Sequence, residues 1–217
     1  MTYSRANPSP RYRELQTMYR QLHEGGETKL GLPPEQTFNG MSLMPQLQRI
    51  KELLDLTGAR TVLDYGSGKG QQYGSLVLKD AAKGVTYKNV IEYWGVDDVH
   101  CYDPCYQPFN TLPQGRFDAV ISTDVLEHCP EQDVPWIIDE IFSYAERCVY
   151  ANIACYPAKK HLPNGENAHC TIKPPSWWDE ILRAAAARRP HLVWEAWVEW
   201  LEAAPTGAVL RKQRIGR

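Results

Sequence analysis

A ten-residue stretch, residues 61–70, constrains the fold of this chain more than any other feature. It reads Thr-Val-Leu-Asp-Tyr-Gly-Ser-Gly-Lys-Gly, so a short apolar run ends in Asp64 and three glycines follow at alternate positions. An unbroken apolar run is typical of a parallel strand that is buried on both faces. Glycine adopts positive φ freely and has no Cβ, so the backbone of such a turn can lie directly against a ligand. The stretch therefore predicts a buried strand that runs into a tight, ligand-binding turn.

Two common glycine-rich ligand loops do not fit this order of residues. A phosphate-binding P-loop has four residues between its first glycine and a Gly-Lys-Ser/Thr triplet, whereas Lys69 here is followed by Gly70. The dinucleotide fingerprint G-x-G-x-x-G also fails, because the third glycine comes one residue early and an acid precedes the turn. The stretch is therefore either a ligand-binding turn of another kind or an ordinary glycine-rich loop.

Two further segments continue the pattern of strands that end in polar residues. Residues 99–103, Val-His-Cys-Tyr-Asp, read as a strand that ends in an acid. Residues 117–128 begin as an apolar strand and end in Val-Leu-Glu-His. Together with residues 61–70, they resemble motif I, the ribose-binding second strand and the fourth strand of the class I S-adenosylmethionine-dependent methyltransferases, in that order. The resemblance covers roughly residues 40–200, which is most of the chain.

The resemblance implies a fold and a domain organisation. We expect an α/β protein with a Rossmann-like, doubly wound, mostly parallel sheet, helices on both faces, an N-terminal helical extension and a shortened third-strand region. A chain of 217 residues suits a single domain with a sizeable core. Within that single methyltransferase domain, residues 1–58 would form a helical cap and lead-in, and residues 59–217 the cofactor-binding core. N-terminal elements of this family often cover the cofactor or line the substrate pocket, and packing alone is the alternative role.

Local patterns place the individual elements. Apolar residues at helical spacing, with capping residues and glycine or proline at the ends, predict helices, and apolar runs predict strands. The expected helices are residues 10–23, 42–57, 71–82, 86–95, 133–145 and 176–189, with Ser42 capping the second and Ser176 with Asp179 capping the last. The expected strands are residues 61–65, 99–103, 117–123, 148–155, 192–200 and 208–215. Residues 192–200 also fit a helix, but the alternation of strands and helices before them favours a strand.

The interval between the second and fourth strands is too short for the usual pattern of the family. Only thirteen residues separate Asp103 from Phe117, and three of them are prolines, which discourage a regular element. The third strand must be shortened or lost, together with the acid that typically meets the adenine. Groups around Thr123 and Asp124 and side chains of residues 102–109 are the remaining candidates for adenine contacts.

The carboxyl ends of parallel strands meet at one edge of a doubly wound sheet, and ligands bind outside that edge. The resemblance implies that S-adenosylmethionine contacts Asp64, Tyr65, Gly66, Ser67, Gly68, Gly70, Asp103, Thr123, Asp124 and Val125. It implies that Asp103 binds the ribose of the cofactor, because a carboxylate can accept hydrogen bonds from both vicinal hydroxyls. Asp97 and Asp98 are rival candidates, since the interval after Gly70 is longer than usual. Asp103 is preferred because an apolar-rich run leads directly into it.

Two histidines are the candidates for a catalytic role. His128 follows the fourth strand, and its unperturbed pKa lies near working pH, as a general base requires. His169 belongs to a loop that the topology directs over the same edge. The candidate substrate-binding residues are Glu127, Tyr156, Trp177 and Trp178, since aromatic walls suit a flat or partly apolar acceptor. Packing is the alternative in each case: a histidine there can cap the next helix, and tryptophans can fill the core.

Composition argues against several other classes of protein. The six cysteines form no C-x-x-C pair, so we expect reduced thiols and no metal site. The formal net charge of −2 argues against bulk nucleic-acid binding, which needs a basic surface. No apolar run is long enough to span a membrane or to serve as a signal peptide, so we expect a cytoplasmic protein without membrane contact. The oligomeric state is not predicted.

The sequence thus predicts an S-adenosylmethionine-dependent methyltransferase that acts on oxygen or nitrogen of a small-molecule acceptor. Fold does not dictate function, so a non-catalytic S-adenosylmethionine-binding or regulatory module is the alternative. A nucleotide-dependent oxidoreductase is a third and weaker option, and it would bind NAD instead. The sequence does not identify the acceptor.

Overall fold

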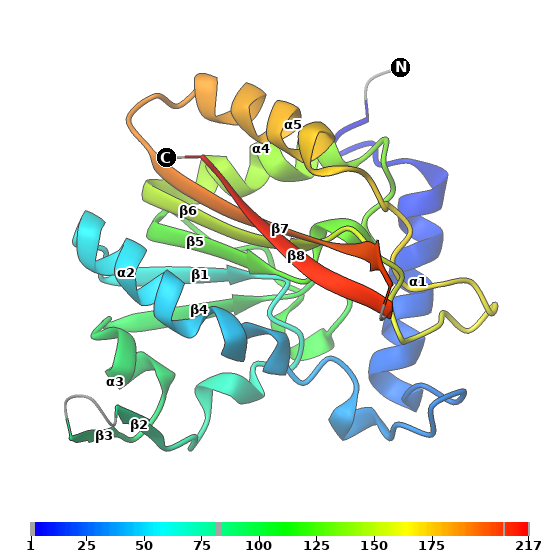
Figure 1. Ribbon diagram of the computed structural model, residues 1–217, viewed down its shortest axis with the longest axis horizontal. Helices are drawn as coiled ribbons and strands as arrows, with labels where there is room; N and C mark the ends of the chain where they lie inside the picture. Colours follow the sequence, from blue (N-terminus) through cyan, green and yellow to red (C-terminus); the bar gives the residue numbers. More distant parts are fainter. Residues whose placement is uncertain (1–2, 81–83, 206, 217) are drawn as a thin grey trace.

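The computed structural model describes residues 3–80, 84–205 and 207–216. The described chain contains a six-stranded sheet with the strand order β4-β1-β5-β6-β7-β8 (Figure 1). Its strands are β1 Thr61–Tyr65, β4 Asp98–Tyr102, β5 Phe117–Thr123, β6 Ala145–Ala154, β7 Val193–Ala204 and β8 Gly207–Gly216. Every neighbouring pair is parallel except β7 and β8, which form an antiparallel hairpin at one edge. This sheet confirms the mostly parallel, Rossmann-like α/β fold that the sequence predicts.

Helices cover both faces of the sheet. The α-helices of the described residues are α1 Pro10–Gly25, α2 Leu47–Thr57, α3 Val90–Trp94, α4 Val134–Tyr144 and α5 Pro175–Ala187. Figure 1 shows α2 and α3 on one face and α4 and α5 on the other, while α1 stands beyond the carboxyl ends of the strands. Short 3-10 helices occupy Pro34–Gln36, Met41–Gln46, Gln71–Tyr73, Gln107–Phe109 and Leu126–His128. A small antiparallel pair, β2 Leu78–Asp80 and β3 Val85–Tyr87, lies outside the main sheet.

Each strand contributes side chains to two hydrophobic layers, because successive side chains of a strand point to opposite faces. In β1, Val62 packs in the layer beneath α2 and α3, and Leu63 packs in the layer beneath α4 and α5. In β5, Ile121 and Val120 divide between the layers in the same way. These residues are at most 1% exposed. Burial on both faces therefore explains why the strands are continuous apolar runs in the sequence.

Helix α1 begins and ends where its sequence signals predict. Pro10 occupies its first turn, and Gly26, at φ 80°, ends it. Ser9 caps the helix, since its Oγ accepts from the backbone N–H of Tyr12 at 3.0 Å. The buried face of α1 carries Leu15, Met18 and Leu22, which form a third hydrophobic cluster with Leu162 and Ala168 of the loop after β6. The helix thereby fixes that loop against the carboxyl edge of the sheet.

The helix expected at residues 71–82 is wrong over the described part of that range. Residues Gln71–Tyr73 form a single 3-10 turn, and Leu78–Asp80 form strand β2, while residues 81–82 lie outside the described residues. Gly74 ends the turn, and the side chain of Gln72 points inward to a buried carboxylate instead of along a helix. The helix expected at 86–95 is likewise shorter, Val90–Trp94, with β3 before it.

Two predicted helix caps are also wrong. Ser42 is exposed inside the 3-10 helix Met41–Gln46, and α2 begins only at Leu47, because Pro45 lacks the N–H that a helix interior needs. Ser176 lies inside α5, which begins at Pro175 after Pro174, without a side-chain cap. Proline already presets the helical φ at the first position, so the helix starts there and not at the serine.

The loss of the third strand is confirmed. Residues 103–116 carry only the short turn Gln107–Phe109, so β4 is the edge strand and β5 pairs directly with β1. The strands predicted at 148–155, 192–200 and 208–215 are present as β6, β7 and β8. Within the described residues, no helix is both long enough and apolar enough to cross a bilayer.

Candidate functional site

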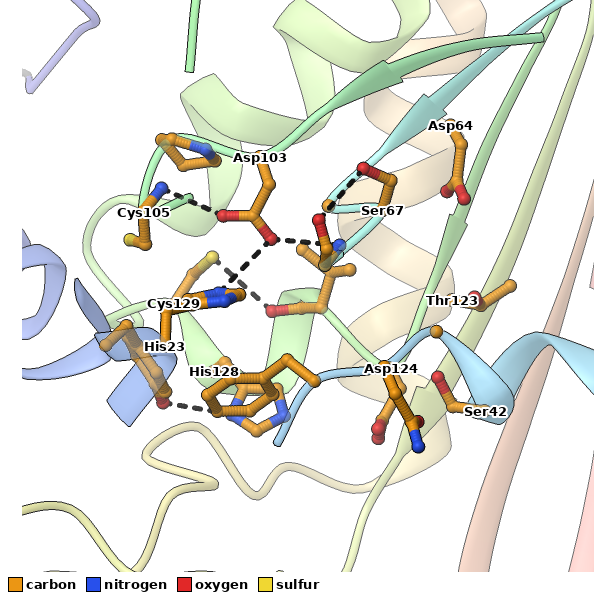
Figure 2. Close-up of a pocket in the computed structure, with 18 of the residues that line it drawn as sticks. His23, Ser42, Asp64, Ser67, Asp103, Cys105, Thr123, Asp124, His128 and Cys129 are labelled. Carbon is orange, nitrogen blue, oxygen red and sulfur yellow. Dashed lines mark hydrogen bonds and ion pairs between the residues drawn. The ribbon is translucent and has the colours of Figure 1, made fainter. Parts of the chain in front are cut away.

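A cavity opens at the carboxyl ends of β1, β4 and β5, where the ligand rule for doubly wound sheets places it. It encloses about 960 Å³ of space when the open solvent at its mouth is included. Figure 2 shows side chains from the turns after all three strands converging on it. The sheet side supplies Asp64, Gly66, Ser67, Gly68, Asp103, Pro104, Cys105, Thr123, Asp124, Val125 and His128. The opposite wall comes from α1 and residues 38–42, so the N-terminal elements do line the pocket.

The glycine turn after β1 is tied to the end of β4. The backbone N–H groups of Gly66 and Ser67 both donate to the carbonyl oxygen of Tyr102, at 2.7 and 3.1 Å. Gly66 and Gly68 have φ of 90° and 59°, where glycine is favoured. A Cβ on Gly66 would lie 2.3 Å from Val125 Cγ2, and one on Gly68 would lie 2.3 Å from the carbonyl oxygen of Phe38. These glycines therefore admit neighbouring protein segments, in addition to any ligand.

Asp64, the last residue but one of β1, has one carboxylate oxygen with hydrogen-bond partners and one without. Its Oδ2 accepts from Tyr73 Oη at 2.8 Å and from Gln72 Nε2 at 3.1 Å. Its Oδ1 and the Oε1 of Gln72 are buried without a hydrogen-bond partner, and both residues line the cavity. Burial raises the pKa of the Asp64 carboxyl to about 7. Two unpaired buried acceptors are costly, so a donor group of a ligand would be stabilised beside them.

Asp103 lies at the cavity, and the rival acids do not. Its Oδ2 accepts from the N–H of Gly68 at 3.0 Å and its Oδ1 from the N–H of Cys105 at 2.8 Å (Figure 2). Burial raises its pKa to about 6. Asp97 pairs with Arg60 at the opposite end of β4, where Asp98 begins the strand.

A neutral histidine lies beside Asp103. His23 of α1 places Nε2 3.8 Å from Asp103 Oδ2, and its ring stacks on Tyr106 at 5.1 Å between centroids. Burial lowers the pKa of His23 to about 3, so it adds no positive charge at neutral pH. Lys69 Nζ donates to the carbonyl oxygen of His23 at 2.9 Å. The N-terminal helix is thus linked to the turns after β1 and β4.

Three titratable side chains meet beside the turn after β5: Asp124 and His128 belong to that turn, and His169 belongs to the loop after β6. Asp124 has φ 60°, an uncommon conformation for a residue with a side chain, and its Oδ1 lies 3.7 Å from His169 Nε2. The two imidazole rings meet edge to face, with centroids 4.6 Å apart. Burial lowers the pKa of His128 to about 4. Burial opposes the charge on Asp124, but the contact with His169 holds its pKa below the ordinary value.

Several residues that the sequence assigns to the site do not line the cavity. Tyr65 points to the α4 side, where its hydroxyl donates to Glu140 at 2.8 Å. A Cβ on Gly70 would contact Phe109, so this glycine serves the packing of the turn. Trp178 is fully buried in the core beneath α5. These positions follow the motifs in sequence, but strand alternation and helix packing direct them elsewhere.

The remaining expected substrate-binding residues also do not line the main cavity. Glu127 is buried, and its Oε1 accepts from the N–H of Ala154 at 2.6 Å, so it holds β6 and does not reach the cavity. The backbone carbonyl oxygen of Tyr156 accepts a hydrogen bond from His169 Nδ1 at 2.6 Å. His169 and Trp177 line a second, shallow hollow on the outer surface. Among the expected catalytic residues, His128 faces the main cavity and His169 lies behind it.

Sequence reasoning missed several lining residues. Gln72, Tyr19, His23, Phe38 and Lys160 all line the cavity. The amphipathic pattern of residues 10–23 predicts the helix that carries Tyr19, but no motif marks the polar residues among the five. Their places depend on how α1 and the loop after β6 pack onto the sheet.

No protein-family model and no curated protein matches this chain. One similar solved structure is described as an O-methyltransferase family protein from Burkholderia thailandensis, with 14% identity and a TM-score of 0.47. The match covers 82% of this chain and 58% of that chain, so this chain spans less than two thirds of the other's length. The sheet order, strand directions and two helical layers of the chain itself make it a Rossmann-like α/β protein.

Proposed function

We propose that the cavity binds S-adenosylmethionine and that the protein transfers its methyl group to oxygen or nitrogen of a small-molecule acceptor. The observation that carries this proposal is the convergence of three acid-containing turns on one cavity. The turns at Asp64–Gly68, Asp103 and Asp124 follow β1, β4 and β5, and all three line it. The sequence resemblance names the same turns independently of the structure.

The charges and free acceptors of the cavity fit this cofactor. S-adenosylmethionine carries an ammonium and a sulfonium, and carboxylates at the wall attract such a cation. The unpaired Oδ1 of Asp64 and Oε1 of Gln72 are acceptors that an ammonium could satisfy. Asp103 uses one acceptor site of each oxygen on backbone N–H groups, which leaves others for hydroxyl donors. The fit therefore rests on hydrogen-bonding capacity as well as on charge.

The cofactor would supply an activated methyl group, and the chain would bind, shield and align. The aromatic rings of Tyr19 and Phe38 line the cavity and would shield the bound cofactor from water. His128 Nδ1 lies 2.9 Å from Tyr19 Oη and 3.0 Å from the carbonyl oxygen of Ala168. Because the Tyr19 hydroxyl donates its proton to the same carbonyl oxygen, both contacts are satisfied when Nδ1 holds the imidazole proton and Nε2 keeps its lone pair. A neutral His128 can then accept a hydrogen bond from the acceptor hydroxyl or amine. With its pKa near 4, it orients the acceptor better than it removes a proton.

Calorimetry on the purified protein tests the ligand. We expect binding of S-adenosylmethionine and S-adenosylhomocysteine, and no heat with NAD or ATP. An isotherm with NAD or ATP and none with either methyl-cycle ligand would contradict the proposal. Mass spectrometry of the co-purified small molecules gives an independent identification of the cofactor and of any bound acceptor.

Turnover separates the enzyme from the alternative, a non-catalytic binding module. We expect S-adenosylhomocysteine to accumulate when S-adenosylmethionine is supplied with the correct phenol, alcohol or amine. Binding without turnover, over a panel that includes any co-purified metabolite, would favour the module. The unpaired acceptors of Asp64 and Gln72 would support cofactor binding in both cases, so only turnover distinguishes the enzyme from the binding module.

A further inference from the structure

We propose that Asp124, His128 and His169 bind a divalent transition-metal ion at the edge of the cavity. Each offers one ligand atom, and these atoms lie within 4.8 Å of one another. No other group of this kind occurs in residues 3–80, 84–205 and 207–216. The proposal is independent of the cofactor, because the three side chains are assembled by the protein alone.

Both imidazoles are oriented as metal ligands usually are. A ligating histidine typically donates its second ring N–H to a carbonyl or carboxylate, which fixes the tautomer and leaves the other nitrogen free. His128 Nδ1 lies 3.0 Å from the carbonyl oxygen of Ala168, and His169 Nδ1 lies 2.6 Å from that of Tyr156. Tyr19 Oη also donates to the Ala168 oxygen, at 2.6 Å, and so fixes that acceptor. Nε2 of His128 is therefore free for an ion, and an ion would replace the proton that His169 Nε2 directs toward Asp124.

The carboxylate of the cluster is held in place by its backbone. Asp124 has φ 60°, and its N–H donates to the carbonyl oxygen of Asn152 at 3.1 Å. Uncommon backbone conformations of this kind concentrate at functional sites. Its Oδ1 lies 3.7 Å from His169 Nε2, and ligand atoms 2.0–2.2 Å from one zinc ion lie about 3–3.5 Å apart. A small side-chain rotation would therefore complete the site.

A second observation at the same place supports a missing positive partner. Glu127, the residue directly before His128, is fully buried, and its Oε2 has no hydrogen-bond partner among the described residues. It interacts electrostatically with both Asp124 and His169. A cation bound by the cluster would place a positive charge near this unpartnered carboxyl oxygen. Lys160, which also lines the cavity, opposes the cation and sets a limit on its affinity.

The ligand set selects the kind of ion. Imidazole nitrogen suits zinc, copper, iron and nickel, whereas magnesium and calcium prefer oxygen. Three protein ligands leave open positions, as catalytic metal sites do. Asp124 and His128 line the cavity, so those positions would face it. If the proposed function holds, the ion would take the place of the direct hydrogen bond between His128 and the methyl acceptor and would bind an oxygen of that acceptor, which favours acceptors with a hydroxyl or carboxylate.

A titration of the untagged, chelator-treated protein with Co²⁺ tests the site. We expect one ion per chain, with visible d–d bands that report histidine ligation, and displacement by Zn²⁺. Asp124→Asn and His169→Ala should each weaken Co²⁺ binding by about 100-fold or more, because the first removes the negative charge of a ligand and the second removes a ligand. His191→Ala is the matched control, since His191 is exposed and lies outside the cluster, and it should bind as the wild type does.

Two further measurements distinguish a loss of metal binding from a loss of folding or of cofactor binding. Circular dichroism and thermal unfolding show whether each variant is folded, and Zn²⁺ should raise the Tm of the wild type and of His191→Ala only. Calorimetry with S-adenosylhomocysteine is run on the same metal-free samples. Binding of that ligand without Co²⁺ binding overturns the metal site alone. Co²⁺ binding that is equally tight in Asp124→Asn and His169→Ala also overturns it.

Discussion

The three acids around the cavity, Asp64, Asp103 and Asp124, are compensated in three different ways. Asp103 is held by two backbone N–H groups, and Asp124 faces an imidazole. Asp64 keeps one buried oxygen without a partner, and burial raises its pKa to about 7. Residue type alone is the same in each case, so their different properties come from their neighbours.

Asp103→Ala should weaken S-adenosylhomocysteine binding by about ten- to a hundred-fold. Loss of hydrogen bonds to a charged group costs about 1.5–3 kcal/mol, which is this change in affinity. The variant should also be less stable, since Gly68 and Cys105 lose the acceptor of their N–H groups. Calorimetry and thermal unfolding measure the two effects.

Asp97→Ala is the matched control for this experiment. Asp97 forms an exposed ion pair with Arg60 at the far end of β4, and such pairs contribute little. Its affinity for S-adenosylhomocysteine should equal that of the wild type. Lost affinity in Asp97→Ala with unchanged affinity in Asp103→Ala would show that the ligand does not reach Asp103.

At the scale of elements, the N-terminal segment and the glycine turn form one unit. The N–H of Lys69 donates to the carbonyl oxygen of Phe38 at 2.8 Å. Tyr19 of α1 packs edge to face on Phe38, with centroids 5.8 Å apart. The cavity wall contributed by α1 and residues 38–42 therefore depends on the shape of the turn after β1.

Gly68→Ala should destabilise the protein by about 1–3 kcal/mol and weaken cofactor binding. The residue has φ 59°, and an added Cβ would lie 2.3 Å from the backbone oxygen of Phe38, which cannot move as a side chain can. Denaturant unfolding and calorimetry measure the two changes. Gly25→Ala, whose Cβ would meet nothing within 4 Å, is the control and should be neutral or slightly stabilising. Wild-type stability in Gly68→Ala would mean that the turn has another conformation in solution.

At the scale of the whole molecule, buried acids and buried histidines make stability depend on pH in opposite directions. Burial raises the pKa of Asp64 and Asp103, so the folded state holds protons there that the unfolded state has released. Stability from these groups is complete below about pH 4 and is lost as pH rises through about 6 to 7. Burial lowers the pKa of His23 and His128, so their contribution increases as pH rises toward about 6.5.

Asp64→Asn isolates one of these contributions. The amide cannot ionise, so the variant should gain free energy of unfolding relative to the ligand-free wild type as pH rises from about 5 to about 8. Urea unfolding at both pH values measures this difference, with the exposed Asp98→Asn as the control. A difference between variant and wild type that does not change with pH would show that Asp64 does not titrate in this range. The same variant should bind S-adenosylhomocysteine more weakly, because the ammonium loses its charged acceptor.

The sequence by itself determined the elements with strong local signals. The apolar run before Asp64, the acid at Asp103 and the proline-rich gap before Phe117 predicted β1, the end of β4 and the missing third strand, and the structure confirms all three. These features depend on burial and backbone chemistry within one segment, which a single sequence records. The false helix at residues 71–82 shows the limit, since tertiary contacts override local propensity there.

Only the tertiary structure decided which side chains meet. Glu127 and His128 are neighbours in the Val-Leu-Glu-His ending, yet Glu127 holds β6 and His128 faces the cavity. His169 reaches Asp124 only because α1 packs the loop after β6 against the sheet edge. These contacts join segments that are far apart in the chain. They depend on the packing of whole elements, which no local pattern of residues encodes.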